Sequence, residues 1–417
     1  MSSEQLRQTA QRSAAKSLGR KRKKGKNINF KMFGLDVFVD GGFDIWFMIF
    51  VLMLLTIGLI MMFSASYVSA KYRADTNHNP MYFIERQSIF AIVGVILMFI
   101  VSRINPELLK KLTPIVTAIS IILLILVLIH PDVDPEKPDI KRWLKLGIRF
   151  QPSDIAKLGM IMMFAWLLEK FRRLIETKWW AALILFGILG FFCVLICLEK
   201  HLSCTLLIFA IGVGMLYLGG VDSRWFIIGG ILAVGVVVIV YTCRNQIFPP
   251  YQVERIDSLF KKDYDDTDTR WQTNQSLFAL GSGGFFGLGL GNSRQKYLFL
   301  PEPQNDFVFA IVGEEFGFLR CTVIILVYAA LVFRGFIIAM RAKSMYERMV
   351  VLGIMLQIGL QTVLNILVVT DLLPNTGIAL PFFSYGGTAL IMQLVEMGMV
   401  LGVSRTGDRK KKEKANA

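Results

Sequence analysis

Long blocks of apolar residues, separated by short polar segments, dominate the pattern of this 417-residue chain. Each block is roughly 16 to 25 residues long, the length that a helix needs to cross a hydrocarbon core about 30 Å thick. Because lipid offers no partner to an open peptide group, a spanning block must be a helix. The pattern predicts an all-α polytopic membrane protein with about ten transmembrane helices, at residues 45–66, 87–103, 112–130, 155–171, 180–198, 203–219, 225–242, 315–333, 349–370 and 386–404.

Two connections on the predicted outer side, 131–154 and 243–314, are longer than a simple turn requires. Long loops often carry function. The second would form a large extracellular loop between the seventh and eighth helices. Its stretch 276–293 is apolar but rich in glycine, which disfavours a spanning helix, so we expect it at the outer interface, partly embedded.

Basic residues support one orientation of these helices. The chain carries 46 Lys and Arg against 31 Asp and Glu, with dense clusters at 20–26 and 409–412. Nucleic-acid binding is one interpretation of such clusters. In a membrane protein the positive-inside rule is the better one, so both termini should be cytoplasmic and near anionic lipid. The expected organisation is a basic arm at 1–44, one transmembrane domain at 45–404 and a basic tail at 405–417.

Composition narrows the chemistry further. With 54% hydrophobic residues and a mean hydropathy of +0.54, the chain is too apolar for an ordinary soluble protein. The first apolar block follows a long polar arm and lacks a small-residue cleavage site, so we do not expect a signal peptide. The sequence has no dinucleotide, Walker or zinc-protease motif, and its three histidines and five cysteines are scattered. A reaction should therefore use a substrate delivered in the lipid.

Asp306 is the candidate for acid–base chemistry. A carboxylate at the mouth of an apolar cavity loses hydration, which raises its pKa and lets it act as a general base toward a hydroxyl group. The alternative is that Asp306 only caps the helix that should start at Phe307, because aspartate is favoured at that position.

Basic residues on the outer side are candidates for holding an anion. Asp154 and Lys157 are three residues apart and should share a helix face, either as a structural ion pair or with Lys157 facing a phosphate. Four further basic residues could form charge-assisted hydrogen bonds to a pyrophosphate: Arg142, Arg255, Arg294 and Lys296. Contact with lipid headgroups is the more common role of basic residues at the membrane interface.

Several stretches resemble the SEDS family, which groups FtsW, RodA and SpoVE. In order, they are Phe63-Ser-Ala-Ser66, Arg142-Trp143 with Phe150-Gln-Pro-Ser-Asp-Ile-Ala-Lys157, Gln275-Ser276 through Gly287-Leu-Gly-Leu-Gly-Asn-Ser293, Leu300-Pro-Glu-Pro303, Asn305-Asp-Phe-Val-Phe-Ala310 with Gly313-Glu-Glu315, and Leu380-Pro-Phe-Phe-Ser-Tyr-Gly-Gly387. They run from the first predicted helix to the last.

The resemblance implies ten helices and a peptidoglycan glycosyltransferase that joins lipid II units by β-1,4 bonds and releases undecaprenyl pyrophosphate. It also implies a class B penicillin-binding protein as partner, alongside other division proteins. The family's essential extracellular aspartate matches Asp306, and its acid-x-x-lysine pair matches Asp154 and Lys157. Whether the reaction needs a divalent cation, Mg²⁺ or Mn²⁺, is left open by the sequence.

Two positions depart from the family pattern. Position 154 is aspartate where glutamate is usual, which shortens the side chain by one methylene, and Glu199-Lys-His-Leu-Ser203 replaces a common Gln-Pro-Asp-Leu-Gly. The segments at 300–303 and 313–315 look closer to FtsW and SpoVE than to RodA, which suggests a role in division. A RodA-like elongation role, a lipid II flippase and a non-enzymatic scaffold are the alternatives.

Overall fold

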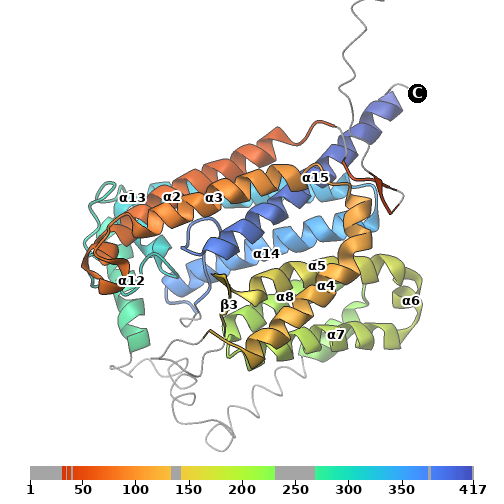
Figure 1. Ribbon diagram of the computed structural model, residues 1–417, viewed down its shortest axis with the longest axis horizontal. Helices are drawn as coiled ribbons and strands as arrows, with labels where there is room; N and C mark the ends of the chain where they lie inside the picture. The colour runs from red at the N-terminus through yellow and green to blue at the C-terminus, as the bar shows by residue number, and fades with distance from the viewer. Residues whose placement is uncertain are drawn as a thin grey trace, which may run out of the picture.

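The chain folds into a bundle of long helices (Figure 1). The computed structural model describes residues 31–33, 35–38, 41–132, 142–230, 268–373 and 377–415. Their bounds are α2 Ile45–Tyr72, α3 Tyr82–Val101, α4 Pro106–Ile129, α5 Pro152–Lys170, α6 Arg172–Thr177, α7 Trp179–Leu198, α8 Leu202–Leu218, α12 Asp268–Gly283, α13 Val308–Met340, α14 Met345–Val369 and α15 Gly387–Ala415, with a 3-10 turn at Ala74–Thr76. The strands are β1 Lys31–Met32, β2 Leu35–Asp36, β3 Leu144–Leu146 and β4 Ile148–Phe150, which pair as two antiparallel hairpins.

Seven helices among the described residues are long and apolar enough to cross a membrane: α2, α3, α4, α7, α13, α14 and α15. Helix α8 is shorter, and α5 is less apolar because it carries Asp154, Lys157 and Glu169. The prediction of a helical, multi-pass chain is confirmed. The count of ten and the large loop remain predictions, because residues 231–267 lie outside the described part of the chain.

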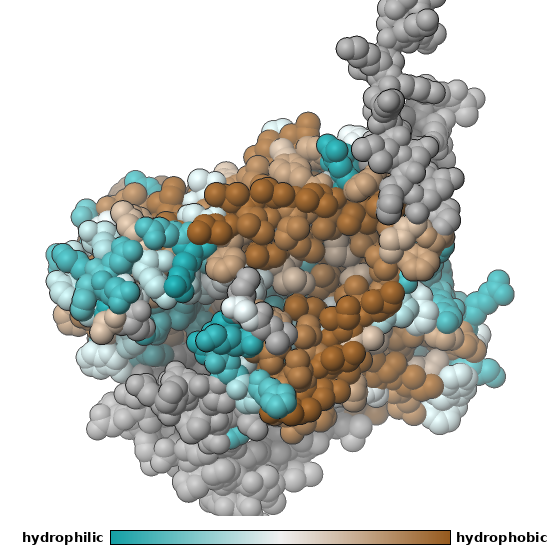
Figure 2. All heavy atoms as spheres, in the orientation of Figure 1, coloured by the Kyte–Doolittle hydropathy of each residue, from teal (hydrophilic) through white to brown (hydrophobic). Residues whose placement is uncertain are grey.

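The outer surface of the bundle is as apolar as a membrane requires. Figure 2 shows apolar side chains spread over α2, α3 and α4, with polar ones gathered toward both ends of the molecule and in a patch near the centre of the view. On α3 the exposed positions include Ile89, Ile92 and Ile96, which soluble proteins would bury. These side chains face lipid instead of water.

Helix α14 forms the centre of the packing. It contacts α5, α8, α13 and α15, while α3 packs along α15 and α4 along α5. Its membrane-length window is 61% buried inside the protein, against 22% for α3. A helix with so many neighbours can carry polar residues at membrane depth, because protein groups rather than lipid surround them.

Helix α13 begins earlier than the predicted span at 315–333 and is broken at Gly317. The backbone there has φ 73° and ψ 178°, which is not helical. The N–H groups of Phe318 and Leu319 consequently lose their helical partners and donate to the carbonyls of Gly284 (2.9 Å) and Phe285 (3.2 Å). The glycine-rich segment therefore supplies hydrogen bonds that the broken helix lacks.

The same segment satisfies the carbonyl groups on the other side of the break. The N–H groups of Leu288 and Gly289 each donate, at 3.0 Å, to the carbonyls of Glu314 and Glu315. Residues 284–291 thus lie against α13 rather than forming a spanning helix of their own, as the sequence indicated. A helix does form just before them, as α12.

The Glu314 side chain fastens the segment that follows. It is fully buried and accepts hydrogen bonds from the backbone N–H groups of Arg294 (2.9 Å) and Gln295 (3.2 Å). It also accepts from the hydroxyls of Ser282 (3.2 Å) and Ser293. Hydrogen bonds to a buried carboxylate are stronger than those between neutral groups, so α12, the glycine-rich segment and α13 form one unit.

We predict that Gly317→Ala destabilises this unit. A Cβ atom at residue 317 would lie 2.2 Å from the backbone nitrogen of Gly287, and its φ is unfavourable for alanine. We expect the free energy of unfolding to fall by about 2 kcal/mol or more. Thermal unfolding of the purified protein in detergent measures the change. The control is Gly281→Ala in α12, where a Cβ meets no atom within 4 Å; equal stability of the two variants would contradict the prediction.

Candidate functional site

The β3–β4 hairpin positions the first group of candidate residues. Leu144 pairs with Phe150 and Leu146 with Ile148, around Gly147 at φ 82°. The hairpin directly follows Arg142 and is followed by Gln151 and α5. Arg142 and the first turn of α5 therefore lie close together, and we call this end of the bundle the hairpin end.

Arg142 links two other segments of the chain. Its Nη2 atom donates to the carbonyl of Lys200, in the turn between α7 and α8, at 2.7 Å. Its charge also acts on Glu199 and His201 in that turn and on Asp306. Arg142 is thus the cation shared by the α7–α8 turn and the candidate base.

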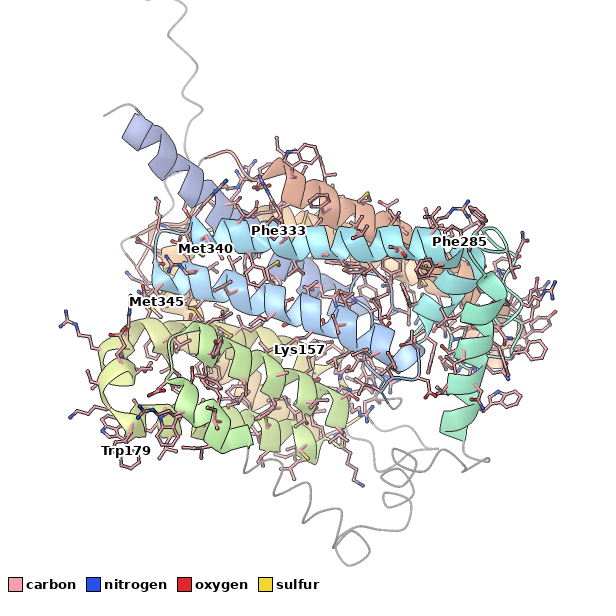
Figure 3. The ribbon with its side chains drawn as sticks, turned by 180° about the vertical axis from the view of Figure 1, so that it is seen from behind. Lys157, Trp179, Phe285, Phe333, Met340 and Met345 are labelled. Carbon is pink, nitrogen blue, oxygen red and sulfur yellow. The ribbon has the colours of Figure 1, made fainter. Side chains whose placement is uncertain are left out.

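Asp154 and Lys157 form the ion pair that their spacing suggested. The Lys157 Nζ atom lies 2.9 Å from Asp154 Oδ1, and the side chains are only 8% and 10% exposed. Figure 3 labels Lys157, on α5 beside α14. A buried pair of this kind costs desolvation, which points to a use beyond stability.

A second carboxylate faces Lys157 from α15. Glu396 is fully buried, its charge acts on Lys157, and it accepts from Gln357 Nε2 of α14 at 3.0 and 2.9 Å. Sequence reasoning missed Glu396, although a glutamate inside the predicted span 386–404 was a signal. Lys157 is therefore held between acids of two helices.

Asp306 lies just before α13, and it does not act as the N-cap of that helix. The N-cap residue is Phe307, and no side-chain hydrogen bond caps the helix. The Asp306 carbonyl accepts from Asn365 Nδ2 of α14 at 2.8 Å. A Cβ atom at Gly377, where φ is 71°, would lie 3.2 Å from Asp306 Oδ2. Asn365 of α14 thus holds the backbone at residue 306, and Gly377, in the segment after α14, lies near the carboxylate; the sequence indicated neither contact.

The loop before Asp306 is tied to other parts of the hairpin end. Glu302 forms an ion pair with Arg73, which follows α2, and accepts from Asn305 Nδ2 at 3.0 Å. The carbonyl of Gln304 accepts from the N–H of Tyr385 at 2.8 Å. Contacts from several segments therefore fix the position of the candidate base.

Burial raises the pKa of Asp306 from 3.8 to about 6. The positive charge of Arg142 opposes this rise, and the negative charge of Glu302 adds to it. At neutral pH the group is mostly ionised, and it is a stronger base than an ordinary aspartate. This is the protonation behaviour that a general base needs.

The other predicted basic residues have different surroundings. Lys296 is buried, and its ammonium group donates to Glu315 Oε1 (3.0 Å), Ser64 Oγ (3.2 Å) and the carbonyl of Gly291 (2.6 Å). These partners use all three ammonium donors, so the structure does not support Lys296 as a phosphate ligand. Arg294 is exposed beside it, and Arg255 lies outside the described residues.

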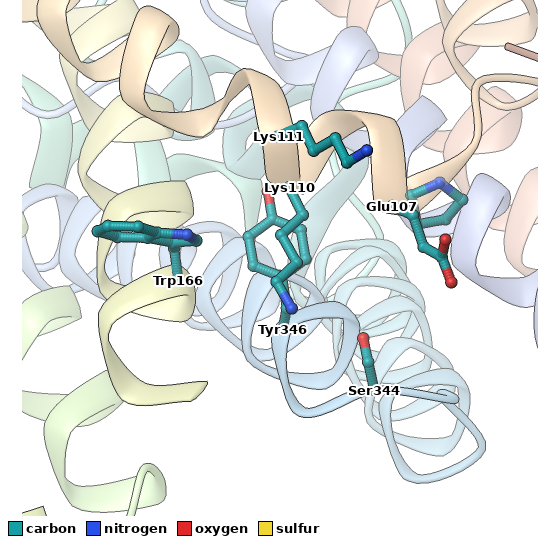
Figure 4. A pocket seen from close by; sticks show the side chains of 7 residues that line it. Glu107, Lys110, Lys111, Trp166, Ser344 and Tyr346 are labelled. Atoms are coloured by element: carbon teal, nitrogen blue, oxygen red, sulfur yellow. The ribbon is translucent and has the colours of Figure 1, made fainter. Parts of the chain in front are cut away.

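A separate pocket lies at the opposite end of the bundle (Figure 4). It has a volume of about 290 Å³ and is lined by Pro106, Glu107, Lys110, Lys111, Trp166, Ser344 and Tyr346. Its lysines already have partners: Lys110 forms an ion pair with Glu169, and Lys111 donates to the carbonyl of Phe33 at 3.0 Å.

A divalent cation finds no evident ligand set in the described ranges. No group of three or more His, Cys, Asp or Glu residues among them is arranged to hold a metal ion. The acids nearest the candidate site are also neighbours of Arg142 or Lys157, whose charges oppose a cation.

Comparisons with known proteins agree with this arrangement. Residues 45–409 match the family model of FtsW, RodA and SpoVE, described as cell cycle proteins. Stage V sporulation protein E of Bacillus subtilis is 38% identical over 365 residues, covering 87% of this chain and 97% of that protein. A probable peptidoglycan glycosyltransferase FtsW of Geobacter sp. (strain M18) is 34% identical, with the same coverage of both.

Two solved structures share the fold. A chain of a peptidoglycan synthase complex matches with a TM-score of 0.70 and 25% identity, covering 88% of this chain and 98% of that one. The rod shape determining protein RodA of Thermus thermophilus matches with a TM-score of 0.61 and 23% identity, covering 87% and 97%. The chain belongs to the FtsW/RodA/SpoVE family.

Proposed function

We propose that this protein is a peptidoglycan glycosyltransferase, which polymerises lipid II into glycan strands on the outer face of the cytoplasmic membrane. Relatives that cover nearly all of its described domain carry the name of that enzyme. The observation that carries the proposal is the juxtaposition of Asp306, with its raised pKa, and Arg142 at the hairpin end. A base beside a cation suits transfer of a sugar from a diphosphate.

The chemistry assigns the base to Asp306. The 4-hydroxyl of the acceptor sugar is a poor nucleophile, and its proton must leave as its oxygen attacks the anomeric carbon of the donor. A positioned carboxylate that accepts this proton accelerates such a step roughly 10² to 10⁴-fold. The hydrogen bond from Asn365 to the Asp306 carbonyl fixes the backbone that carries this carboxylate.

The leaving group needs positive charge rather than a proton. As the anomeric carbon–oxygen bond breaks, negative charge develops on undecaprenyl pyrophosphate. Arg142 and Lys157 are the cations that would stabilise it, and both act electrostatically on the α7–α8 turn. One carboxylate therefore suffices, whereas glycoside hydrolases usually need two.

The relatives also indicate a role and a partner. Matches at 38% and 34% identity bear the names SpoVE and FtsW, so we assign the chain to division or sporulation rather than elongation. A chain of similar fold belongs to a complex that coordinates polymerisation and crosslinking. We infer a crosslinking partner of the class B penicillin-binding protein type, reached from the outer face, with both termini of this chain in the cytoplasm.

The break in α13 is the observation that would favour a lipid II flippase, because transporters use broken helices to line a substrate path. In this chain the glycine-rich segment fills the break, and its backbone groups are paired with that segment. The break thus does not line a path. A flippase would move labelled lipid II across vesicles without forming polymer.

The first test is Asp306→Asn, which keeps the size of the side chain but cannot accept the proton. We expect the purified variant to express and insert normally and yet to form no glycan, even at raised pH. Gel-resolved polymerisation of lipid II, with and without the partner, measures this. Robust polymer formation by the variant would remove Asp306 from the mechanism.

The pH dependence of the unmodified protein follows from the same group. A base with a pKa of about 6 is active when deprotonated, so the rate should rise as pH increases through about 6 and level off above 7. Initial rates between pH 5 and 7.5 give this profile. A rate that does not change over this range would show that Asp306 does not titrate in the rate-limiting step.

We also predict that Gly377→Ala slows the reaction. Its Cβ would crowd Asp306 Oδ2 and force alanine into a left-handed backbone. Misplacement of a reacting group by about 1 Å can cost about 10²-fold, so we expect a loss of about 10 to 100-fold in kcat. The matched control is Gly386→Ala, where the nearest atom is 3.5 Å away. Equal rates for both variants would show that Gly377 does not position the base.

Lys157 and Asp154 should differ in importance. Lys157→Met leaves the Asp154 and Glu396 carboxylates uncompensated and removes a phosphate ligand, whereas Asp154→Asn keeps the cation. We expect Lys157→Met to cost about 3 to 5 kcal/mol of stability and more activity than Asp154→Asn. Unfolding in detergent and polymerisation assays report the two effects.

The control for this pair is Arg172→Met, which breaks the exposed pair with Glu176 and should cost less than about 1 kcal/mol. Wild-type rates and stability in both Lys157→Met and Asp154→Asn would make the buried pair dispensable.

A further inference from the structure

The turn between α7 and α8 holds a carboxylic acid that the proposed reaction does not use. The turn consists of Glu199, Lys200 and His201, and Lys200 has a left-handed backbone with φ 57°. Its side chain is exposed, while that of Glu199 is buried. Because Arg142 donates to the Lys200 carbonyl, the turn is tied to the candidate site. Strained backbone of this kind is common at functional sites.

Glu199 lacks the partners that a buried acid normally has. Its side chain is 0% exposed, and within the described part of the chain neither carboxyl oxygen has a hydrogen-bond partner. Leaving a buried polar group unpaired costs about 1 to 3 kcal/mol. Most such groups in proteins are paired, so these two oxygens call for a partner that the described residues do not supply.

The acid is neutral under ordinary conditions. Burial raises the pKa of Glu199 to about 8, against the opposing effect of Arg142 and with a further increase from Asp154. Below that pH the group carries its proton. It can then donate one hydrogen bond through its O–H and accept others, as a carboxyl group kept neutral by its surroundings does in other enzymes.

His201 has the same neutral character. Burial and the charges of Arg142 and Lys157 lower its pKa to about 3, so the imidazole carries no charge. Its Nε2 atom lies 3.4 Å from the Nε2 donor of Gln151, which assigns the proton to Nδ1. Nδ1 has no partner among the described residues. A second neutral group is therefore available beside Glu199.

The neutral groups and the cations suit two parts of one ligand. Arg142 and Lys157 suit the diphosphate, whereas a neutral carboxyl and an imidazole N–H suit hydroxyl or amide groups. We propose that Glu199 and His201 form a sugar-binding subsite, which hydrogen-bonds to the hydroxyl or acetamido groups of the sugar attached to the diphosphate of a lipid-linked substrate. This subsite deepens the proposed function and rests on it.

The test compares two lipids that share the undecaprenyl diphosphate, of which only one carries the disaccharide with its peptide. Binding of lipid II and of sugar-free undecaprenyl pyrophosphate is measured with the full chain in detergent, in an Asp306→Asn background so that lipid II is not consumed. Glu199→Leu should weaken binding of lipid II by about tenfold or more and leave undecaprenyl pyrophosphate unchanged. Loss of a hydrogen-bonded sugar group accounts for an effect of this size.

A pH series provides a second measurement that a structural role would not change. The groups facing Glu199 are Arg142, Asp154 of α5 and Cys204 of α8. As pH rises through about 8, Glu199 ionises and loses its donor, so binding of lipid II by the parent should weaken. Glu199→Gln keeps a donor and an acceptor at every pH, and its binding should stay constant. Weakening by the same factor in this variant would overturn the proposal.

Glu347→Gln is the matched control, because Glu347 is buried to a similar degree at the opposite end of the bundle. It should bind both lipids like the parent. Equal losses for the two lipids in Glu199→Leu would overturn the sugar subsite. If the parent binds neither lipid, the proposed function fails; if it prefers lipid II and Glu199→Leu keeps that preference, only the subsite fails.

Discussion

Every polar group inside this bundle needs a partner, because lipid supplies none. The junction of α13 with the glycine-rich segment shows how the backbone meets this requirement: Gly317 breaks the helix, and residues 284–289 provide the missing backbone hydrogen bonds. Glu314 and the Glu315–Lys296 pair then fasten the chain that leads to residue 306. The position of Asp306 thus depends on how the break in α13 is satisfied.

In the candidate site, too, buried charged groups have partners, which come from different segments of the chain. Its charges form a connected series in which Arg142 acts on Asp306 and the α7–α8 turn, and Lys157 lies between Asp154 and Glu396. Within this series Lys157 acts on Asp154 and Glu396, and Arg142 acts on Asp306 and Glu199. Glu199 stands out in this series because it is buried, neutral and without a partner in the described structure.

Part of this arrangement could be predicted from local patterns. Long apolar blocks marked the helices, since their length and composition are fixed by the membrane. The spacing of Asp154 and Lys157 gave their pairing, because residues three apart share a helix face. The glycines at 281–291 excluded a spanning helix. By contrast, the start of α13 was placed seven residues too late, because charged Glu314 and Glu315 hid the helical character of the residues around them.

The sequence by itself determined the helical, multi-pass class of the chain and the helical face that carries Lys157, since both depend on residues a few positions apart. Only the tertiary structure decided which charges meet. Glu396 faces Lys157, Asn365 holds Asp306, and Lys296 lies in an internal ion pair rather than toward substrate. The physical reason is that burial and pairing depend on residues far apart in the chain, which come together only when α5, α13, α14 and α15 pack.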